Sequence, residues 1–150
     1  MELHLMLFLC VAVCSFTGKE VAGNAPLVYF KASLPKSLNA GYYYFGVGSI
    51  IPFSSVEANI GHGYNPTSGV FHAPVSGYYQ FQTLLQTERG PRQGTSDFGL
   101  FSQGYAKAWL TIPMPYASTS MSVIIHVNKA DHVFVKKTLD NGKSPLRQGA

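Results

Sequence analysis

The sequence predicts an all-β fold, and three observations point to it. From Leu27 onward, short apolar or aromatic runs alternate with clusters of Gly, Pro and Asn, which is typical of strands separated by turns. The run at Gly77–Gln86 (GYYQFQTLLQ) has the period of two that places one face of a strand against a core. No stretch of this region keeps the 3.6-residue period of an amphipathic helix. We therefore expect one β domain.

Each candidate strand is a short run of β-branched or aromatic residues bounded by turn residues. In chain order the candidates are Leu27–Ser33, Tyr42–Val47, Val70–His72, Gly77–Gln86, Tyr105–Ile112, Met121–Asn128 and His132–Lys137. The predicted core face of the fourth carries Tyr79, Phe81, Thr83 and Leu85. Because Asn128–Asp131 is short enough for a hairpin connection, we expect the last two candidates to be antiparallel neighbours. The polar segment Glu88–Ser96 predicts an exposed loop.

The N-terminus has the pattern of a secretion signal. Leu3–Val13 is an apolar run too short to span a bilayer, and Val13 and Ser15 supply small residues for cleavage. We predict a signal peptide over residues 1–18, with cleavage between 15 and 23, a short linker over 19–26 and the domain over 27–150. A buried N-terminal helix is the alternative. The prediction implies a secreted protein without a membrane span.

Composition excludes several classes of protein. With 46% hydrophobic and 12% charged residues, the chain is too apolar to be a disordered tail. Its 15 Gly and 9 Pro follow no Gly-X-Y period, which excludes a collagen stalk in this chain. Both cysteines, Cys10 and Cys14, fall in the predicted leader, so we expect neither disulfides nor thiol chemistry in the mature domain.

Basic residues gather between Lys129 and Arg147, in a chain of formal charge +4. They predict a patch for anionic ligands at Lys136, Lys137 and Lys143. The alternative is a solvated strand edge, where lysines discourage pairing with other chains. No nucleic-acid-binding motif accompanies the charge.

Patterns that carry enzyme chemistry are missing from the sequence. It has no phosphate-binding Gly-rich loop, no Gly-X-Ser-X-Gly elbow and no His-Glu-X-X-His motif. Its acidic residues are few and far apart, and its histidines lack metal-ligand spacing. We therefore predict a protein that is not an enzyme and that has no cofactor and no metal site.

One segment, Ile51–Gln82, resembles the signature of the C1q domain family. The matching landmarks are Phe53, Asn59, Gly61, Tyr64, Gly69, Phe71, Pro74, Gly77, Tyr79 and Phe81. The resemblance implies a jelly-roll β-sandwich of the C1q and tumour-necrosis-factor-like kind. It also implies assembly as a homotrimer, or as a heterotrimer with related chains, and ligands on variable outer loops. We expect the landmarks themselves to hold the fold, with Gly69 and Gly77 at turns that need a positive φ or close packing.

The resemblance also predicts a difference from the family. Family members continue into a last strand inside the inner sheet, and Lys143–Ala150 (KSPLRQGA) does not have the character of a strand. The sequence therefore predicts a sandwich whose last strand is missing. Some family members bind calcium near the trimer axis, and no residue here marks that site.

Together these features predict a secreted C1q-like recognition module of innate-immune or lectin-like type, which binds an extracellular glycan or protein. The alternative is a secreted structural or signalling ligand for a cell-surface or matrix protein. We expect the ligand surface on Glu88–Ser96 and Lys129–Arg147, because loops on a rigid β scaffold commonly carry recognition.

Overall fold

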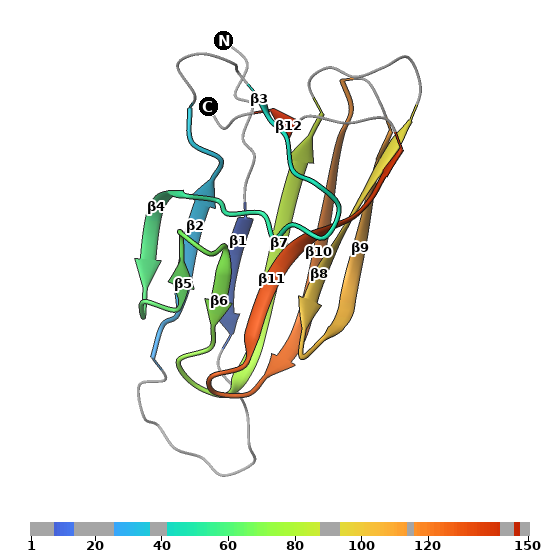
Figure 1. Cartoon of the computed structure of the whole chain (residues 1–150). Coiled ribbons are helices and arrows are strands. Elements are labelled where there is room, and N and C mark those ends of the chain that lie inside the picture. Colours follow the sequence, from blue (N-terminus) through green and yellow to red (C-terminus); the bar gives the residue numbers. More distant parts are fainter. Residues whose placement is uncertain are drawn as a thin grey trace.

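The computed structural model describes residues 8–13, 26–36, 42–87, 94–113, 116–141 and 146–147, which form a sandwich of antiparallel sheets (Figure 1). The first sheet has the order β10-β7-β1-β2-β4, with bounds Ser118–Val127, Gly77–Gln86, Phe8–Val13, Tyr29–Ser33 and Ser55–Ile60. The second has the order β5-β6-β11-β8-β9, with bounds Tyr64–Asn65, Val70–His72, His132–Asn141, Thr95–Ser102 and Tyr105–Pro113. A small sheet pairs β12 (Leu146–Arg147) with β3 (Tyr42–Tyr43). The predicted all-β jelly-roll sandwich is confirmed.

The core lies between the two large sheets. On β7, the predicted core face is confirmed, since Tyr79, Phe81, Thr83 and Leu85 are all buried. From the second sheet, β6 contributes Phe71, whose ring meets the rings of Tyr79 and Phe81 edge-on at 5.3 and 5.6 Å. Such edge-to-face contacts add stability beyond the burial of apolar area.

Three of the C1q-like landmarks, Phe53, Asn59 and Tyr64, form a hydrogen-bond network centred on Tyr64. The Tyr64 hydroxyl accepts a hydrogen bond from the Phe53 N–H at 3.0 Å and donates one to the Phe53 carbonyl at 3.2 Å. The Asn59 side chain bonds both backbone groups of Tyr64, at 2.8 and 3.2 Å. Burial raises the pKa of Tyr64 above its usual range, so the hydroxyl keeps the proton that it donates.

Gly69 is needed for its backbone conformation. Its φ is +74°, and a Cβ there would lie 2.5 Å from the carbonyl oxygen of Ile51. The expectation of a positive φ is therefore confirmed for Gly69, whereas Gly77 begins β7 as an ordinary buried strand residue.

The predicted hairpin between β10 and β11 is wrong. β10 pairs with β7 in the first sheet, whereas β11 pairs with β6 and β8 in the second. The turn between them crosses from one sheet to the other. This crossing lets Val127 and Val133, at the two ends of the turn, bury their side chains in the core between the sheets. Asp131 holds the turn by accepting the Asn128 N–H at 3.0 Å.

Two further predictions about strands are corrected. Thr95 and Ser96, which were expected in an exposed loop, begin β8, and Ser96 is fully buried; residues 88–93 lie outside the described residues. The C-terminal segment was expected to contain no strand, but Leu146 and Arg147 form β12. The Leu146 side chain is buried in the core, which explains why this short pairing forms.

β1 occupies an interior place in the first sheet. Phe8–Val13 pairs antiparallel with β7 on one side and β2 on the other, as Figure 1 shows in blue. These residues belong to the predicted signal peptide, and that processing step stays a prediction. In the whole chain this segment joins β2 and β7 into one continuous sheet.

We predict that Tyr79→Ala or Phe81→Ala lowers the free energy of unfolding by about 3 to 5 kcal/mol, because each empties a buried aromatic site. The matched control is Tyr78→Ala on the same strand, since Tyr78 is 51% exposed. We expect it to cost about 1 kcal/mol or less. Urea unfolding followed by circular dichroism measures all three. Equal costs for Tyr78 and Tyr79 would contradict the assigned core face.

We also predict that a chain beginning at Asn24 unfolds at lower urea concentration than the whole chain. Its β2 and β7 would lack the strand that lies between them, and unpaired buried backbone groups cost about 1 to 3 kcal/mol each. A synthetic peptide with the β1 sequence, added to the shortened chain, should restore part of the lost stability. An unchanged midpoint would mean that β1 contributes nothing to the sheet.

Candidate functional site

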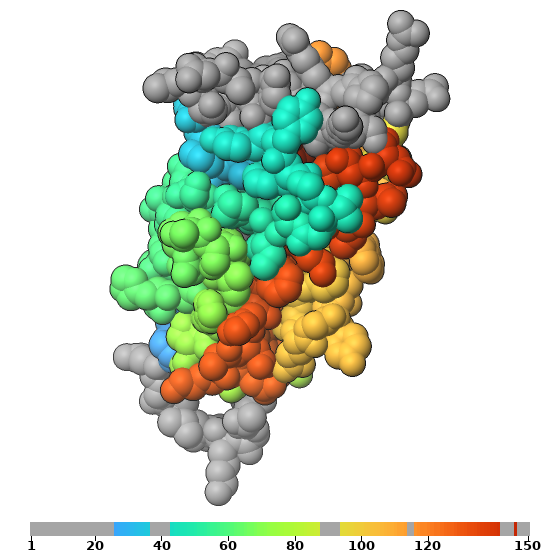
Figure 2. Space-filling view, viewed as in Figure 1, coloured from blue at the N-terminus to red at the C-terminus, as the bar shows by residue number. Residues whose placement is uncertain are grey.

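The face of the second sheet that points away from the core carries a partly exposed cluster of aromatic and basic side chains. On β11, Val133, Val135 and Lys137 point into the sandwich, so the alternating residues His132, Phe134 and Lys136 point outward. On β9 the outward positions are exposed and hold Tyr105, Lys107 and Trp109. Figure 2 shows this face, with orange atoms of β11 beside amber atoms of the β8 and β9 region.

Phe101, on β8, is the centre of the cluster. Its ring stacks beside Phe134, with centroids 5.9 Å apart and planes 9° apart, and it meets Trp109 edge-on at 5.9 Å. The Lys136 ammonium lies 4.1 Å from the centroid of the Phe101 ring, within the range of a cation–π interaction. We call Phe101, Trp109, Phe134 and Lys136 the platform.

Gly99 makes the platform possible. In the ladder it pairs with Lys136 on β11 and with Trp109 on β9, so a straight row crosses three strands. A Cβ at Gly99 would lie 2.6 Å from the Phe101 ring, which therefore needs the space that glycine leaves. The Phe101 ring thus lies over the backbone of Gly99, between the Lys136 ammonium and the Trp109 indole.

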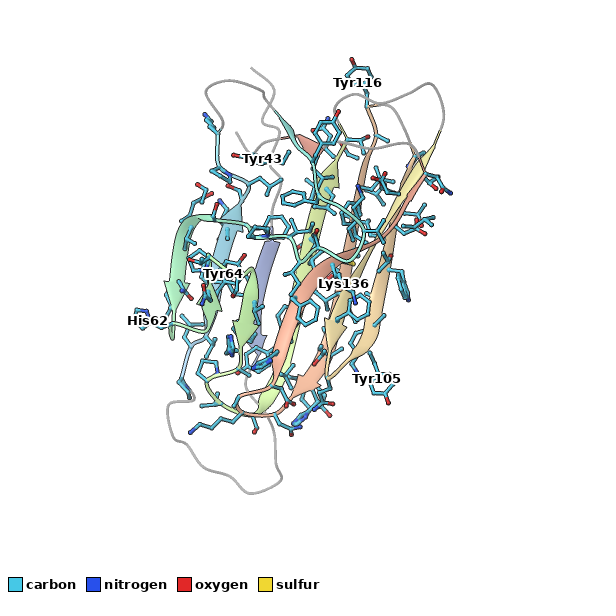
Figure 3. All side chains as sticks on the ribbon, viewed as in Figure 1. Tyr43, His62, Tyr64, Tyr105, Tyr116 and Lys136 are labelled. Atoms are coloured by element: carbon cyan, nitrogen blue, oxygen red, sulfur yellow. The ribbon has the colours of Figure 1, made fainter. Side chains whose placement is uncertain are left out.

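The platform is accessible, and β9 extends it to the edge of the sheet. Trp109 is 59% exposed and Tyr105 is 73% exposed, with the Lys107 ammonium 5.8 Å from the Tyr105 ring. Figure 3 labels Lys136 on β11 and Tyr105 at the end of β9. Contiguous exposed aromatic surface with adjacent charge is typical of a binding site, because large rings in water are costly unless a partner covers them.

The structure separates two lysines of the predicted anionic patch, Lys136 and Lys137. Lys136 lies on the platform, where its half-buried side chain reaches the Phe101 ring. Lys137 is only 1% exposed and forms an ion pair with Asp140 at 2.8 Å, so its place in a surface patch is a wrong prediction. The alternation of the strand is the reason, since neighbours on a strand face opposite sides. Lys143 lies outside the described residues.

A pair of histidines lies on the same face, beside the platform. His72 on β6 is opposite His132 on β11, and their ring centroids are 4.4 Å apart. Partial burial, and then the neighbouring His132, lower the pKa of His72. His132 precedes Phe134 by two residues, so the histidines and the platform follow one another along β11.

Sequence reasoning missed Phe101, Trp109 and Phe134. One signal was available, because Tyr105, Lys107 and Trp109 alternate along a predicted strand whose other face is apolar. That pattern indicates an exposed face with aromatic residues. The platform also needs Phe101, which lies on the neighbouring strand β8, and Lys136, which is far from Trp109 in the sequence.

Comparison with known proteins places the fold. The sequence profile of the C1q domain matches residues 37–148. Among solved structures, the globular domain of zebrafish complement 1qA protein matches with a TM-score of 0.58 and 16% identity, over 78% of this chain and 89% of that one. The described residues include no helix long and apolar enough to cross a membrane. The profile match covers most of the chain, and the chain belongs to the C1q domain family.

Proposed function

We propose that this chain is a secreted recognition module that binds an extracellular ligand through the platform. The C1q domain is a non-enzymatic module for binding ligands or partners, which supports a role in recognition. The observation that carries the proposal is the exposed Trp109 ring beside Phe101 and Lys136. Nothing in the described part of the platform resembles a nucleophile activated by a base.

The chemistry of the platform favours an acidic saccharide. The apolar C–H face of a sugar ring can cover an exposed aromatic ring, while a carboxylate or sulfate can pair with an ammonium group. Trp109 offers the ring, and Lys136 and Lys107 offer the charges. This ligand class agrees with the innate-immune and lectin-like role that the sequence predicted.

Rigid support strengthens the proposal. The platform residues project from paired strands of one sheet, and sites on strands hold their geometry better than sites on loops. Binding therefore needs little ordering of the protein, which lowers its entropic cost.

Assembly as a trimer is part of the proposal. C1q domains generally form trimers, and the outer face of the first sheet offers the 62% exposed Ile124 as an apolar contact. That face lies opposite the platform, so assembly there would leave the platforms of all copies accessible.

The second candidate function is a structural or signalling ligand for a cell-surface or matrix protein. The same platform supports it, because Trp and Tyr are also frequent at the centres of protein interfaces. A protein ligand would cover Trp109 and Tyr105 together without depending on Lys136.

We predict that Trp109→Ala weakens binding of heparin or lipopolysaccharide at least tenfold, because it removes an exposed aromatic contact of the hot-spot type. Lys136→Glu should weaken it similarly, and added salt should weaken binding to the wild type, because exposed charges are screened within about 8 Å. Titration at low and high salt measures both effects.

The matched controls are Tyr116→Ala, which removes a 62% exposed ring away from the platform, and Lys129→Glu in the β10–β11 turn. Both should bind as the wild type does. Binding that is independent of salt and of Lys136, but lost with Trp109→Ala, would favour the protein ligand. Wild-type affinity for all four variants would overturn the platform as the binding site.

We predict that cells expressing the whole sequence release the protein with cleavage between residues 15 and 23. The apolar core of the leader is short and small residues follow it. Mass spectrometry of conditioned medium gives the mature N-terminus. An intact Met1 on protein kept in the cytosol would contradict the secreted localisation.

A further inference from the structure

The histidine pair beside the platform has the geometry of a cross-strand ligand pair. The His72 N–H donates to the Gly63 carbonyl at 2.8 Å, on the side of β6 that faces away from β11. His72 and His132 are therefore a non-hydrogen-bonded pair of the β6–β11 ladder, the position at which opposite side chains come closest.

Backbone bonds hold both histidines in register. Next to the pair, the Ala73 N–H donates to the Asp131 carbonyl at 3.1 Å, and the Ala130 N–H donates to the Ala73 carbonyl at 2.8 Å. Both side chains lie on the exposed outer face. The two imidazoles are thus presented to solvent from a fixed backbone, which reduces the entropy lost when one ion binds both.

The distance between the rings suits a shared ion. Two imidazoles that bind one tetrahedral Zn²⁺ through nitrogens at about 2.1 Å have ring centres about 5 Å apart. The centroids of His72 and His132 are 4.4 Å apart, with planes at 68°. The separation of the two rings is therefore close to the one that a shared ion requires.

We propose that His72 and His132 form a site for one divalent transition-metal ion, Zn²⁺ or Cu²⁺, with water in the remaining positions. Imidazole nitrogen suits these ions, whereas Ca²⁺ and Mg²⁺ require oxygen ligands. Within the described ranges, no group of three or more His, Cys, Asp or Glu side chains gathers, and the proposed site uses two protein ligands, His72 and His132. The neighbouring Asp131 carboxylate is engaged by Asn128 and Gln103.

The site leaves coordination positions open toward solvent. His132, Phe134 and Lys136 alternate along the outer face of β11, so these open positions lie beside the platform. The metal site depends on the histidines alone and stands whether or not the platform binds a saccharide.

The test is calorimetric titration of the untagged whole chain with ZnCl₂ and with CuCl₂. We expect one ion per chain, and an affinity at least tenfold lower for His72→Gln and for His132→Gln. Electron paramagnetic resonance of the Cu²⁺-loaded wild type should report two nitrogen donors, and either substitution should reduce them to one. CaCl₂ should give no saturable heat.

The matched controls are His62→Gln and His126→Gln, which change exposed histidines on other parts of the molecule. They should keep the wild-type affinity. Circular dichroism verifies that each variant is folded, as expected for substitutions on an exposed face. Absence of saturable uptake, wild-type affinity in His72→Gln and His132→Gln, or an equal loss in the controls would overturn the proposal.

Discussion

The sandwich depends on aromatic contacts that join its two sheets. Phe30, on β2 of the first sheet, stacks on Tyr64 of the second at 4.4 Å, and on Phe71 at 5.4 Å. The Tyr64 hydroxyl is in turn bonded to both backbone groups of Phe53. The Tyr64 ring therefore makes apolar contacts, and the Tyr64 hydroxyl satisfies buried polar groups of the backbone. Each contribution depends on the other, because both come from one side chain. Tyr64 pairs with Phe71 in the ladder, which fixes β6 and through it β11.

The same alternation that builds the core builds the proposed binding face. Along β11 every second side chain enters the sandwich, and the residues between them form the histidine pair and the platform. Lys137 falls on the inner side of this alternation, where a charged group is costly unless it is paired. Its ammonium reaches Asp140, three residues along the chain, and lies 5.9 Å from the Phe98 ring. Two adjacent lysines thus have opposite roles, one inside the fold and one on the platform.

The N-terminal segment combines two kinds of physical character. Short, apolar and partly β-branched, Phe8–Val13 suits the core of a secretion signal and also suits a strand buried inside a sheet. In the whole chain it lies between β2 and β7, so it serves the ladders of both. Cleavage of the predicted leader would therefore remove β1 from the first sheet, because one set of residues belongs to both.

The sequence by itself determined the β class, the core face of β7 and membership in a family, because each of these is written in local patterns. A period of two shows which residues share a face, and a spaced signature such as Phe53, Asn59 and Tyr64 is visible along the chain. Only the tertiary structure decided which strands are neighbours. β10 and β11 follow one another but lie in different sheets, while Gly99 brings Lys136 and Trp109 into one row. The tertiary structure also decided the platform and the histidine pair, since both join residues that are distant in sequence. The physical reason is that alternation specifies the side of a strand that faces the core, whereas strand pairing is set by which faces can be buried together across the whole sandwich.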